Sequence, residues 1–331
     1  MKNLRRKLLV QSLALGAGVV VSFGMASTAL AEFTPQKPIQ FVVMAGKGGG
    51  ADKAVRLMQS IIAKNKMAPV PVTPINKPGG SGAEALVYMK GKKGDNHTIM
   101  FTLNSFYTTP LRQPGLGVDI ATFTPVARMA EDTFLLWVNS DRKDINNVGD
   151  FVKAAKAKGN NWIMAGTGKA SEDNLLTDFL NTAYGLNMKY VPYKGGGKVA
   201  KELAGNNADS TVNNPSEQLG FFEAGKTKPL AAFTPTRLPM FKDTPTFTEL
   251  GEDMVYFMQR TVVGAPGMSK DAEAYYVDLF TRVFNSDEWQ TYRKKKSLQG
   301  DLLTGQKLMD YWKNERDIHK IMLIKMGAIP G

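Results

Sequence analysis

Short apolar runs alternate with segments of helical periodicity along most of this chain. Residues 38–43 (PIQFVV) predict a first strand, and apolar positions at helical spacing predict a helix that begins near Asp52. The same alternation predicts further strands at residues 70–75, 98–103, 134–138, 162–165, 188–191, 208–212 and 230–233. Strands that alternate with helices in this way predict an α/β fold with mostly parallel sheets.

The C-terminal part of the chain has a different pattern. After Tyr256 the periodicity becomes helical and ends in a long segment at residues 308–326, so we expect helices without strands there, packed onto the first lobe. Without its first 31 residues the chain has about 300 residues, which exceeds what one core usually serves, so two domains are expected, here called lobes. The predicted boundaries are 32–130 plus 255–331 for lobe 1 and 131–254 for lobe 2, with a first crossing at residues 134–138.

The N-terminus predicts export. Its basic residues are Lys2, Arg5, Arg6 and Lys7. An apolar segment at residues 8–25 follows, and Ala29-Leu30-Ala31 is typical of a cleavage site, so residues 1–31 are predicted to be a secretory signal peptide. A membrane anchor is the alternative, which the polar residues Gln11 and Ser12 disfavour. The adjacent arginines leave the choice between general and twin-arginine export open.

Cysteine content and charge narrow the function classes. The chain has no cysteine, which excludes disulfides, thiolate metal sites and a lipid-carrying cysteine after the leader. We therefore expect a protein that is free in the periplasm and not lipid-anchored. The formal charge of +12 falls to +8 (12 − 4) without the leader, and because the basic residues are scattered, nucleic acid is not an expected partner.

Two glycine-rich turns follow predicted strands and precede predicted helices, at residues 46–52 and 166–172. Glycine allows a ligand to approach the backbone amides closely, and a helix N-terminus presents unpaired N–H groups and a partial positive charge. Ligands of open α/β sheets lie at the carboxyl ends of the strands. The two turns therefore predict an anion site, one turn from each lobe, across the cleft.

Catalytic and cofactor sites are not expected. Residues 46–51 (GKGGGA) match a dinucleotide fingerprint, but no acidic residue stands near the end of the next strand, at residues 74–78. The serine-containing loops lack a complete G-x-S-x-G elbow, and the only histidines, His97 and His319, lie far apart in sequence. A metal centre, a hydrolase triad and a bound cofactor are accordingly disfavoured.

Motifs along the mature chain resemble the tripartite tricarboxylate transporter receptor family (TctC or Bug proteins). Residues 43–52 (VMAGKGGGAD) are similar to the family's VPFAPGGGTD, and residues 76–82 (NKPGGSG) to NRPGAGG. Further similar segments are residues 94–98 (GDNHT), 123–128 (FTPVAR), 165–173 (AGTGKASED), 191–197 (VPYKGGG) and 243–251 (DTPTFTELG). The resemblance implies a two-lobed fold of the type II periplasmic-binding-protein class, with a hinge and a cleft between the lobes that binds a carboxylate.

The resemblance also implies which residues bind the ligand. Gly48, Gly49 and Gly50 would offer backbone amides, with Ser81 and Ser105 beside them in the first lobe. In the second lobe the implied ligand residues are Thr167, Gly168 and Ser171, with Asn213 or Asn214 near the far end of the ligand.

Other candidates depend on the residues themselves. Lys47 and Lys169 stand where the family has proline and serine, so a ligand with at least two carboxylates is one interpretation, and lysines directed to solvent are the other. Tyr193 either lines the cleft or packs in the core, and Asp52 is expected to complement a helix N-terminus.

The predicted function is a monomeric periplasmic receptor that delivers a di- or tricarboxylate to a tripartite membrane permease. A sensor that docks on a kinase and an exported hydrolase remain as alternatives.

Overall fold

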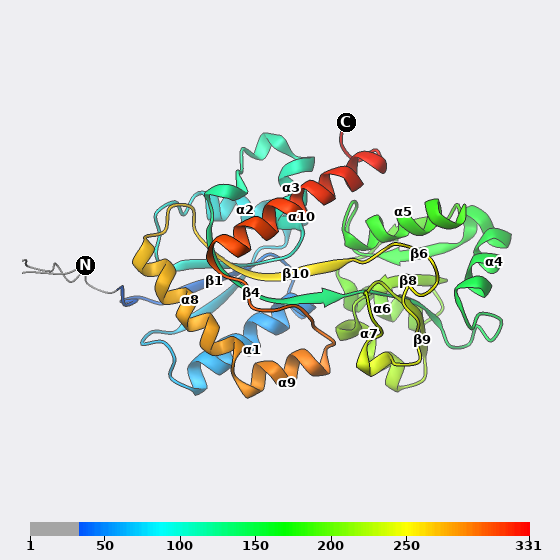
Figure 1. Ribbon diagram of the computed structural model, residues 1–331, viewed down its shortest axis with the longest axis horizontal. Coiled ribbons are helices and arrows are strands. Elements are labelled where there is room, and N and C mark those ends of the chain that lie inside the picture. Colours follow the sequence, from blue (N-terminus) through cyan, green and yellow to red (C-terminus); the bar gives the residue numbers. More distant parts are fainter. Residues whose placement is uncertain (1–32) are drawn as a thin grey trace, which may run out of the picture. The chain divides into compact units, whose positions relative to one another are not determined.

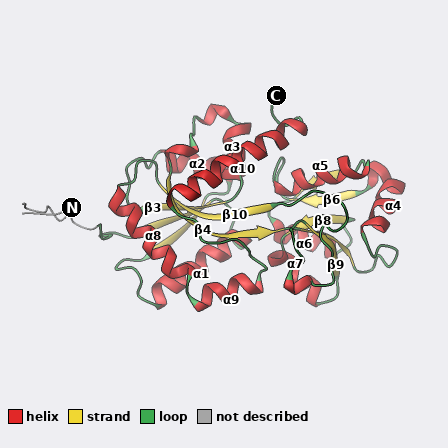
Figure 2. Ribbon diagram, in the orientation of Figure 1, coloured by secondary structure: helices red, strands yellow, loops and turns green. Residues whose placement is uncertain are grey.

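The computed structural model describes residues 33–331, and the predicted signal peptide, residues 1–31, lies outside the described residues. Two five-stranded sheets form the centres of two lobes (Figures 1 and 2). The first sheet has the order β2-β1-β3-β10-β4, from β1 (Ile39–Val43), β2 (Val72–Asn76), β3 (Thr98–Thr102), β4 (Thr124–Thr133) and β10 (Phe257–Gly264). The second has the order β7-β6-β8-β5-β9, from β5 (Leu135–Asn139), β6 (Ile163–Gly166), β7 (Lys189–Pro192), β8 (Ser210–Asn213) and β9 (Thr227–Ala232).

Helices connect and cover the strands. The first lobe contains α1 (Gly50–Lys64), α2 (Ala83–Lys90), α3 (Ser105–Arg112), α8 (Lys270–Phe284), α9 (Asp287–Lys295) and α10 (Gly305–Lys325). The second contains α4 (Val148–Lys158), α5 (Glu172–Tyr184), α6 (Gly196–Ala204) and α7 (Pro215–Glu223). Short 3-10 turns lie at η1 (Gly79–Gly82), η2 (Pro114–Leu116), η3 (Ile120–Thr122), η4 (Gly159–Asn161) and η5 (Pro239–Phe241). No helix within residues 33–331 combines the length and the hydropathy that crossing a bilayer requires.

The predicted α/β class is confirmed, with a change in strand direction. In the first sheet β1 pairs in parallel with β2 and β3, whereas β10 runs antiparallel to β3 and β4. The second sheet repeats the scheme, since β6 is parallel to β7 and β8 and β5 is antiparallel to β8 and β9. Both sheets are therefore mixed. The strands that precede the glycine-rich turns, β1 and β6, lie in the parallel part of each sheet.

The prediction that the chain after Tyr256 contains no strand was wrong. Residues 257–264 form β10, which inserts between β3 and β4. The sequence pattern did not indicate a strand because Gln259 and Arg260 are polar yet buried. In addition, the pairing of β10 with β4 shifts register twice. Period-2 alternation of apolar and polar residues, the usual signal of a strand, is absent from such a segment.

The chain passes between the lobes along neighbouring strands. β4 belongs to the first sheet and β5, which follows after Phe134, belongs to the second. The return path enters β10, which lies beside β4 (Figure 1). The predicted boundaries at residues 130/131 and 254/255 fall within or next to these segments and stay predictions.

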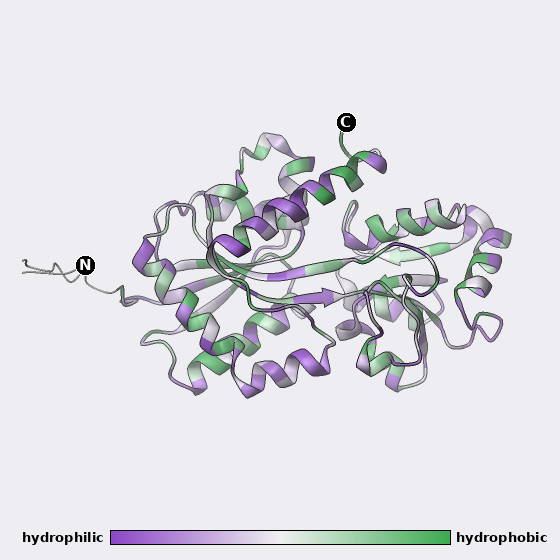
Figure 3. Ribbon diagram, in the orientation of Figure 1, coloured by the Kyte–Doolittle hydropathy of each residue, from purple (hydrophilic) through white to green (hydrophobic). Residues whose placement is uncertain are grey.

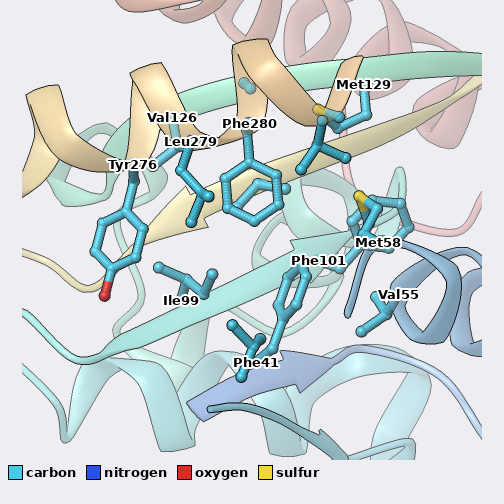
Figure 4. Packing of buried hydrophobic residues seen from close by; sticks show 14 of the residues in the cluster. Phe41, Val55, Met58, Ile99, Phe101, Val126, Met129, Tyr276, Leu279 and Phe280 are labelled. Carbon is cyan, nitrogen blue, oxygen red and sulfur yellow. The ribbon is translucent and has the colours of Figure 1, made fainter. Parts of the chain in front are cut away.

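A core of aromatic and aliphatic side chains holds the first sheet against its helices. Phe41 on β1 packs edge-to-face on Phe101 of β3 and on Phe280 of α8, with ring centroids 6.2 and 5.6 Å apart (Figure 4). Val55 and Met58 of α1 close the same cluster, and both are 0 % exposed. Figure 3 shows the matching pattern on the helices, where hydrophobic and hydrophilic residues alternate along α1 and α8.

His319, on α10, is a packed and not a catalytic histidine. Its Nδ1 lies 2.7 Å from the Glu315 carbonyl oxygen, and its Nε2 lies 2.8 Å from the Tyr256 hydroxyl. Burial holds the pKa of His319 at about 4, below its ordinary value near 6.5, although the bond to the Glu315 carbonyl opposes the shift. The folded protein therefore binds this imidazole in its neutral form.

Replacement of this histidine is expected to remove part of the acid sensitivity of folding. A histidine with a depressed folded pKa stabilises the fold above its unfolded pKa, and that stability is lost as pH falls towards the folded pKa. The loss in the natural protein should amount to about 3 kcal/mol by pH 4. Urea unfolding of His319→Gln near pH 7.5 and near pH 5 should show a weaker decline than the natural protein.

The other histidine offers the matched control. His97 is only partly buried and lies beside Asp95, so His97→Gln should leave the pH dependence nearly unchanged. An unaltered pH dependence in His319→Gln would show that the buried imidazole does not titrate as described.

Candidate functional site

A cavity of about 750 Å³ lies where turns of both lobes meet. Its first-lobe wall contains residues 44–51, Pro78, Gly79, Ser81, Gly82, Leu103, Ser105, Thr108 and Arg112. Its second-lobe wall contains Phe134, Thr167, Gly168, residues 170–173, residues 193–198, Asn214 and Glu217, and Met258 and Arg260 of β10 complete the lining. The glycine-rich turns that follow β1 and β6 thus line one cavity.

The first-lobe turn is held by a buried carboxylate. The Gly48 amide donates to Asp52 Oδ2 over 2.9 Å, and the same carboxylate accepts hydrogen bonds from Arg56 and Asn76 at 3.0 Å each. Burial alone would raise the pKa of Asp52, but these hydrogen bonds outweigh it and leave the pKa below its ordinary value. Gly48 itself has φ +80°, a conformation that favours glycine. Asp52 therefore fixes the turn and keeps its charge.

The second-lobe turn repeats this arrangement. The Thr167 amide donates to Asp173 Oδ2 over 2.7 Å, and the Ser171 hydroxyl donates to the Gly168 carbonyl over 2.7 Å. Burial, with the neighbouring carboxylates of Glu172 and Glu217, raises the pKa of Asp173 to about 8. Each lobe therefore uses an aspartate in the first turn of a helix to shape its glycine-rich loop.

The two walls approach each other closely. A Cβ atom at Gly168 of the second lobe would lie 3.3 Å from the Ser81 hydroxyl of the first. Arg112 Nη1, in the first lobe, lies 3.5 Å from the Lys169 carbonyl oxygen. Gly50, at the start of α1, and Glu217, on α7, both line the cavity. A small ligand in this cavity is therefore within reach of both glycine-rich turns.

Most residues expected at the site line this cavity. They are Lys47, Gly48, Gly49, Gly50, Ser81, Ser105, Thr167, Gly168, Ser171, Tyr193 and Asn214. Tyr193 also packs on the small cluster of Ala165 and Val199, so it combines its two expected positions.

Two expected residues lie outside the lining. Lys169 is exposed, so of the two lysines only Lys47 is a cavity residue. Asn213 is 3 % exposed, and its Nδ2 donates to the Gly196 carbonyl over 3.1 Å while its Oδ1 accepts the Asn214 amide at 2.8 Å. Its amide group supports the start of α6.

Sequence reasoning did not assign the charged residues Arg260, Glu172 and Glu217 to the cavity lining as a group. Arg260 on β10 forms a buried ion pair with Asp132 on β4, with its Nε 3.1 Å from Asp132 Oδ2 and its Nη2 also in contact. Glu172 and Glu217 line the second-lobe side. The position of Arg260 near the second crossing allowed a pairing with the ligand or with an acid at the hinge, but Asp132 was not identified as its partner because residues 257–264 were not predicted as a strand. No sequence motif marks Glu217 as a site residue. Its only indication is its position shortly after Asn213 and Asn214, at the end of a strand.

The comparisons with known proteins agree with this geometry. The model of the tripartite tricarboxylate transporter family receptor, TctC, matches residues 54–273. The chain belongs to this family. The family comprises periplasmic binding proteins and not enzymes, which confirms the expected class and excludes the hydrolase alternative.

Solved structures show the same two-lobed fold. The periplasmic binding protein BugD is 20 % identical, with a TM-score of 0.80 over 89 % of this chain and 99 % of BugD. Rpa4515 of R. palustris, solved with adipate, is 24 % identical, with a TM-score of 0.79 over 88 % of this chain and 98 % of its own. MatC from Rhodopseudomonas palustris, with bound malate, is 19 % identical, with a TM-score of 0.75 over 87 % of this chain and 99 % of MatC.

Proposed function

We propose that this receptor captures a small organic carboxylate in the cavity and delivers it to the membrane permease of a tripartite tricarboxylate-type transporter. The observation that carries the proposal is the convergence of the two glycine-rich turns on one cavity of about 750 Å³. Amides at the starts of α1 and α5 stabilise negative charge there. The relatives Rpa4515 and MatC hold adipate and malate, which supports a di- or tricarboxylate as the ligand.

The proposed ligand contacts follow from the lining. The amides of Gly48, Gly49 and Gly50, together with Lys47, would bind a carboxylate from the first lobe, with Ser81 and Ser105 next to it. Thr167 and Gly168 would bind from the second lobe. The hydroxyl of Ser171 donates to the Gly168 carbonyl and accepts the Thr167 hydroxyl at 3.3 Å, so this side chain supports the turn.

Ligand binding would favour the closed arrangement of the lobes. Contacts that a ligand makes with both walls exist only when the walls are close, so the ligand shifts the equilibrium towards closure. The hinge would lie in the segments where the chain passes from β4 to β5 and returns to β10. The signal peptide predicted in residues 1–31 would direct the receptor to the periplasm.

Titration calorimetry tests the ligand class. Purified protein is titrated with mono-, di- and tricarboxylates of matched chain length, and the proposal expects micromolar or tighter binding within the di- or tricarboxylates. Binding of neutral compounds alone would refute it. Co-purification from membranes distinguishes a transport receptor from a sensor. Recovery of a pair of permease subunits would support transport, whereas recovery of a sensor kinase would support sensing.

A further inference from the structure

The C-terminal helix α10 contacts both lobes. In its N-terminal half, Leu308 and Trp312 are buried in a first-lobe cluster that includes Val42 of β1 and Met100 of β3. Trp312 also packs on Phe106 of α3, with ring centroids 5.0 Å apart. The C-terminal end of the helix instead reaches α5 of the second lobe (Figure 1). One helix therefore spans the line along which the lobes meet.

The contact with the second lobe is an apolar cluster centred on Leu323. This side chain is 0 % exposed, and it packs with Ala170 and Leu175 of the second lobe. Leu111 of α3, in the first lobe, packs against the same cluster. We call the whole set the interlobe seam, which consists of Leu111, Ala170, Leu175, Met322, Leu323, Met326 and Ile329.

The interlobe seam adjoins the ligand cavity. Ala170 lies in the glycine-rich turn after β6, and it lines the cavity as well as the seam. Its φ is +51°, a conformation that a residue other than glycine keeps only where its surroundings hold it. Next to Leu111, Arg112 places its Nη1 3.5 Å from the Lys169 carbonyl oxygen of the second lobe. A movement that separates the two turns would therefore also open the seam.

The middle of α10 is fixed at the crossing between the lobes. His319 lies 2.8 Å, through its Nε2, from the hydroxyl of Tyr256, the residue before β10. Hinge segments absorb the rotation of two lobes, so this contact would persist when the lobes part. Leu323 lies about 6 Å further along the helix, where it meets α5. The seam is therefore the part of the α10 packing that a hinge motion would break.

We propose that the interlobe seam is a latch, in which Leu323 of α10 docks on Ala170 and Leu175 when the lobes close and separates from them when the lobes open. Burial of Leu323 against the second lobe stabilises the closed form, because it removes apolar surface from water. The latch thus sets the affinity and the release rate of the ligand without contacting it. Its effect on affinity rests on the proposed function, whereas its effect on lobe opening does not.

Leu323→Ala removes most of the apolar contact across the seam. A receptor that is mostly open without ligand would lose affinity by about tenfold, chiefly through faster release. A receptor that is mostly closed would first become more open, with a larger radius of gyration. Calorimetry and stopped-flow release with malate, adipate and citrate as probes give the affinity and the rate. Small-angle X-ray scattering gives the radius of gyration of the unliganded protein.

Two other buried leucines are matched controls. Leu308→Ala truncates a side chain on the same helix α10 that packs in the first lobe alone. Leu180→Ala does so on α5, within the core of the second lobe. Both variants should lower the midpoint of thermal unfolding, and both should leave the affinity, the release rate and the radius of gyration unchanged.

Leu175→Ala approaches the same contact from the second lobe, so it should reproduce the effect of Leu323→Ala. Because the two substitutions remove one shared contact, the variant with both should lose little more affinity than either alone. Thermal unfolding of each variant confirms that it is folded.

The failure of the latch and the failure of the proposed function are distinguishable. Unchanged affinity and unchanged radius of gyration in Leu323→Ala would overturn the latch. An equal loss of affinity in Leu308→Ala and Leu180→Ala would also overturn it, since general destabilisation would then explain the loss. If the natural protein binds none of the three probes, the proposed function fails. The radius of gyration of unliganded Leu323→Ala then decides the latch, which an increase supports and an unchanged value overturns.

Discussion

A Gly49→Asp, Gly168→Asp variant is expected to lose about 100-fold or more of its affinity for organic acids. Gly49 caps α1 with φ −75° and ψ 174°, which any residue adopts, and a Cβ atom there would meet only the Gly46 carbonyl oxygen at 3.6 Å. A Cβ atom at Gly168 would lie 3.3 Å from the Ser81 hydroxyl, across the cavity. The variant therefore places two negative charges at the proposed carboxylate site, where like charge costs several kcal/mol.

Two control variants show whether the loss of affinity comes from the added charge, from the added side-chain volume or from damage to the fold. Gly49→Asn with Gly168→Asn adds side chains of the same size without charge, so it should lose less affinity than the aspartate pair. Gly115→Asp adds a charge at an exposed turn with open space around the Cβ position, and it should bind normally. Calorimetry on all three variants gives the comparison. Undiminished binding by the Gly49→Asp, Gly168→Asp variant would contradict the proposal that both glycine-rich turns bind the ligand.

The parts of the fold that could be predicted are those in which local pattern and tertiary structure agree. The strand at residues 38–43 and the helix near Asp52 appear as β1 and α1, because an apolar strand with a glycine turn and an amphipathic helix bury complementary faces. The glycine-rich turns could be assigned to an anion site since strand ends and helix starts meet at one edge of a sheet. The family could be inferred from ordered motifs, and the match over residues 54–273 confirms it.

The parts that could not be predicted depend on contacts distant in sequence. Arg260 is buried only because Asp132 stands opposite it on β4, 128 residues away, so nothing local distinguishes it from a surface arginine. Lys169 lies within a predicted site loop yet is exposed, since the backbone conformation of the turn, which the motif does not specify, decides where the side chain points. Glu172 and Glu217 line the same cavity from separate helices, a juxtaposition that only the folded chain shows.

Removal of the Arg260 guanidinium is expected to destabilise the fold by about 3–5 kcal/mol, because it leaves the Asp132 carboxylate buried without a counter-charge. Asp132 is 1 % exposed and Arg260 is 4 % exposed, and they join β4 to β10 at the crossing between the lobes. Burial raises the pKa of Asp132, and Arg260 limits that rise. In Arg260→Met the folded pKa of Asp132 should therefore rise further, and the measurement is urea unfolding of the variant against the natural protein.

The sign of the pH dependence provides a second check on the same variant. A carboxyl group whose folded pKa exceeds its unfolded pKa costs stability as pH rises, so the deficit of Arg260→Met should be larger near pH 8 than near pH 5. Arg260→Met with Asp132→Leu removes both charges and should recover most of the loss. The exposed pair Arg282–Asp278, with side chains 42 % and 67 % accessible, is the matched control, and Arg282→Met should cost less than about 1 kcal/mol. A deficit in Arg260→Met as small as that control, or one that grows at low pH, would mean that Asp132 is not held as a buried anion, and the two crossing strands would then owe their stability to packing alone.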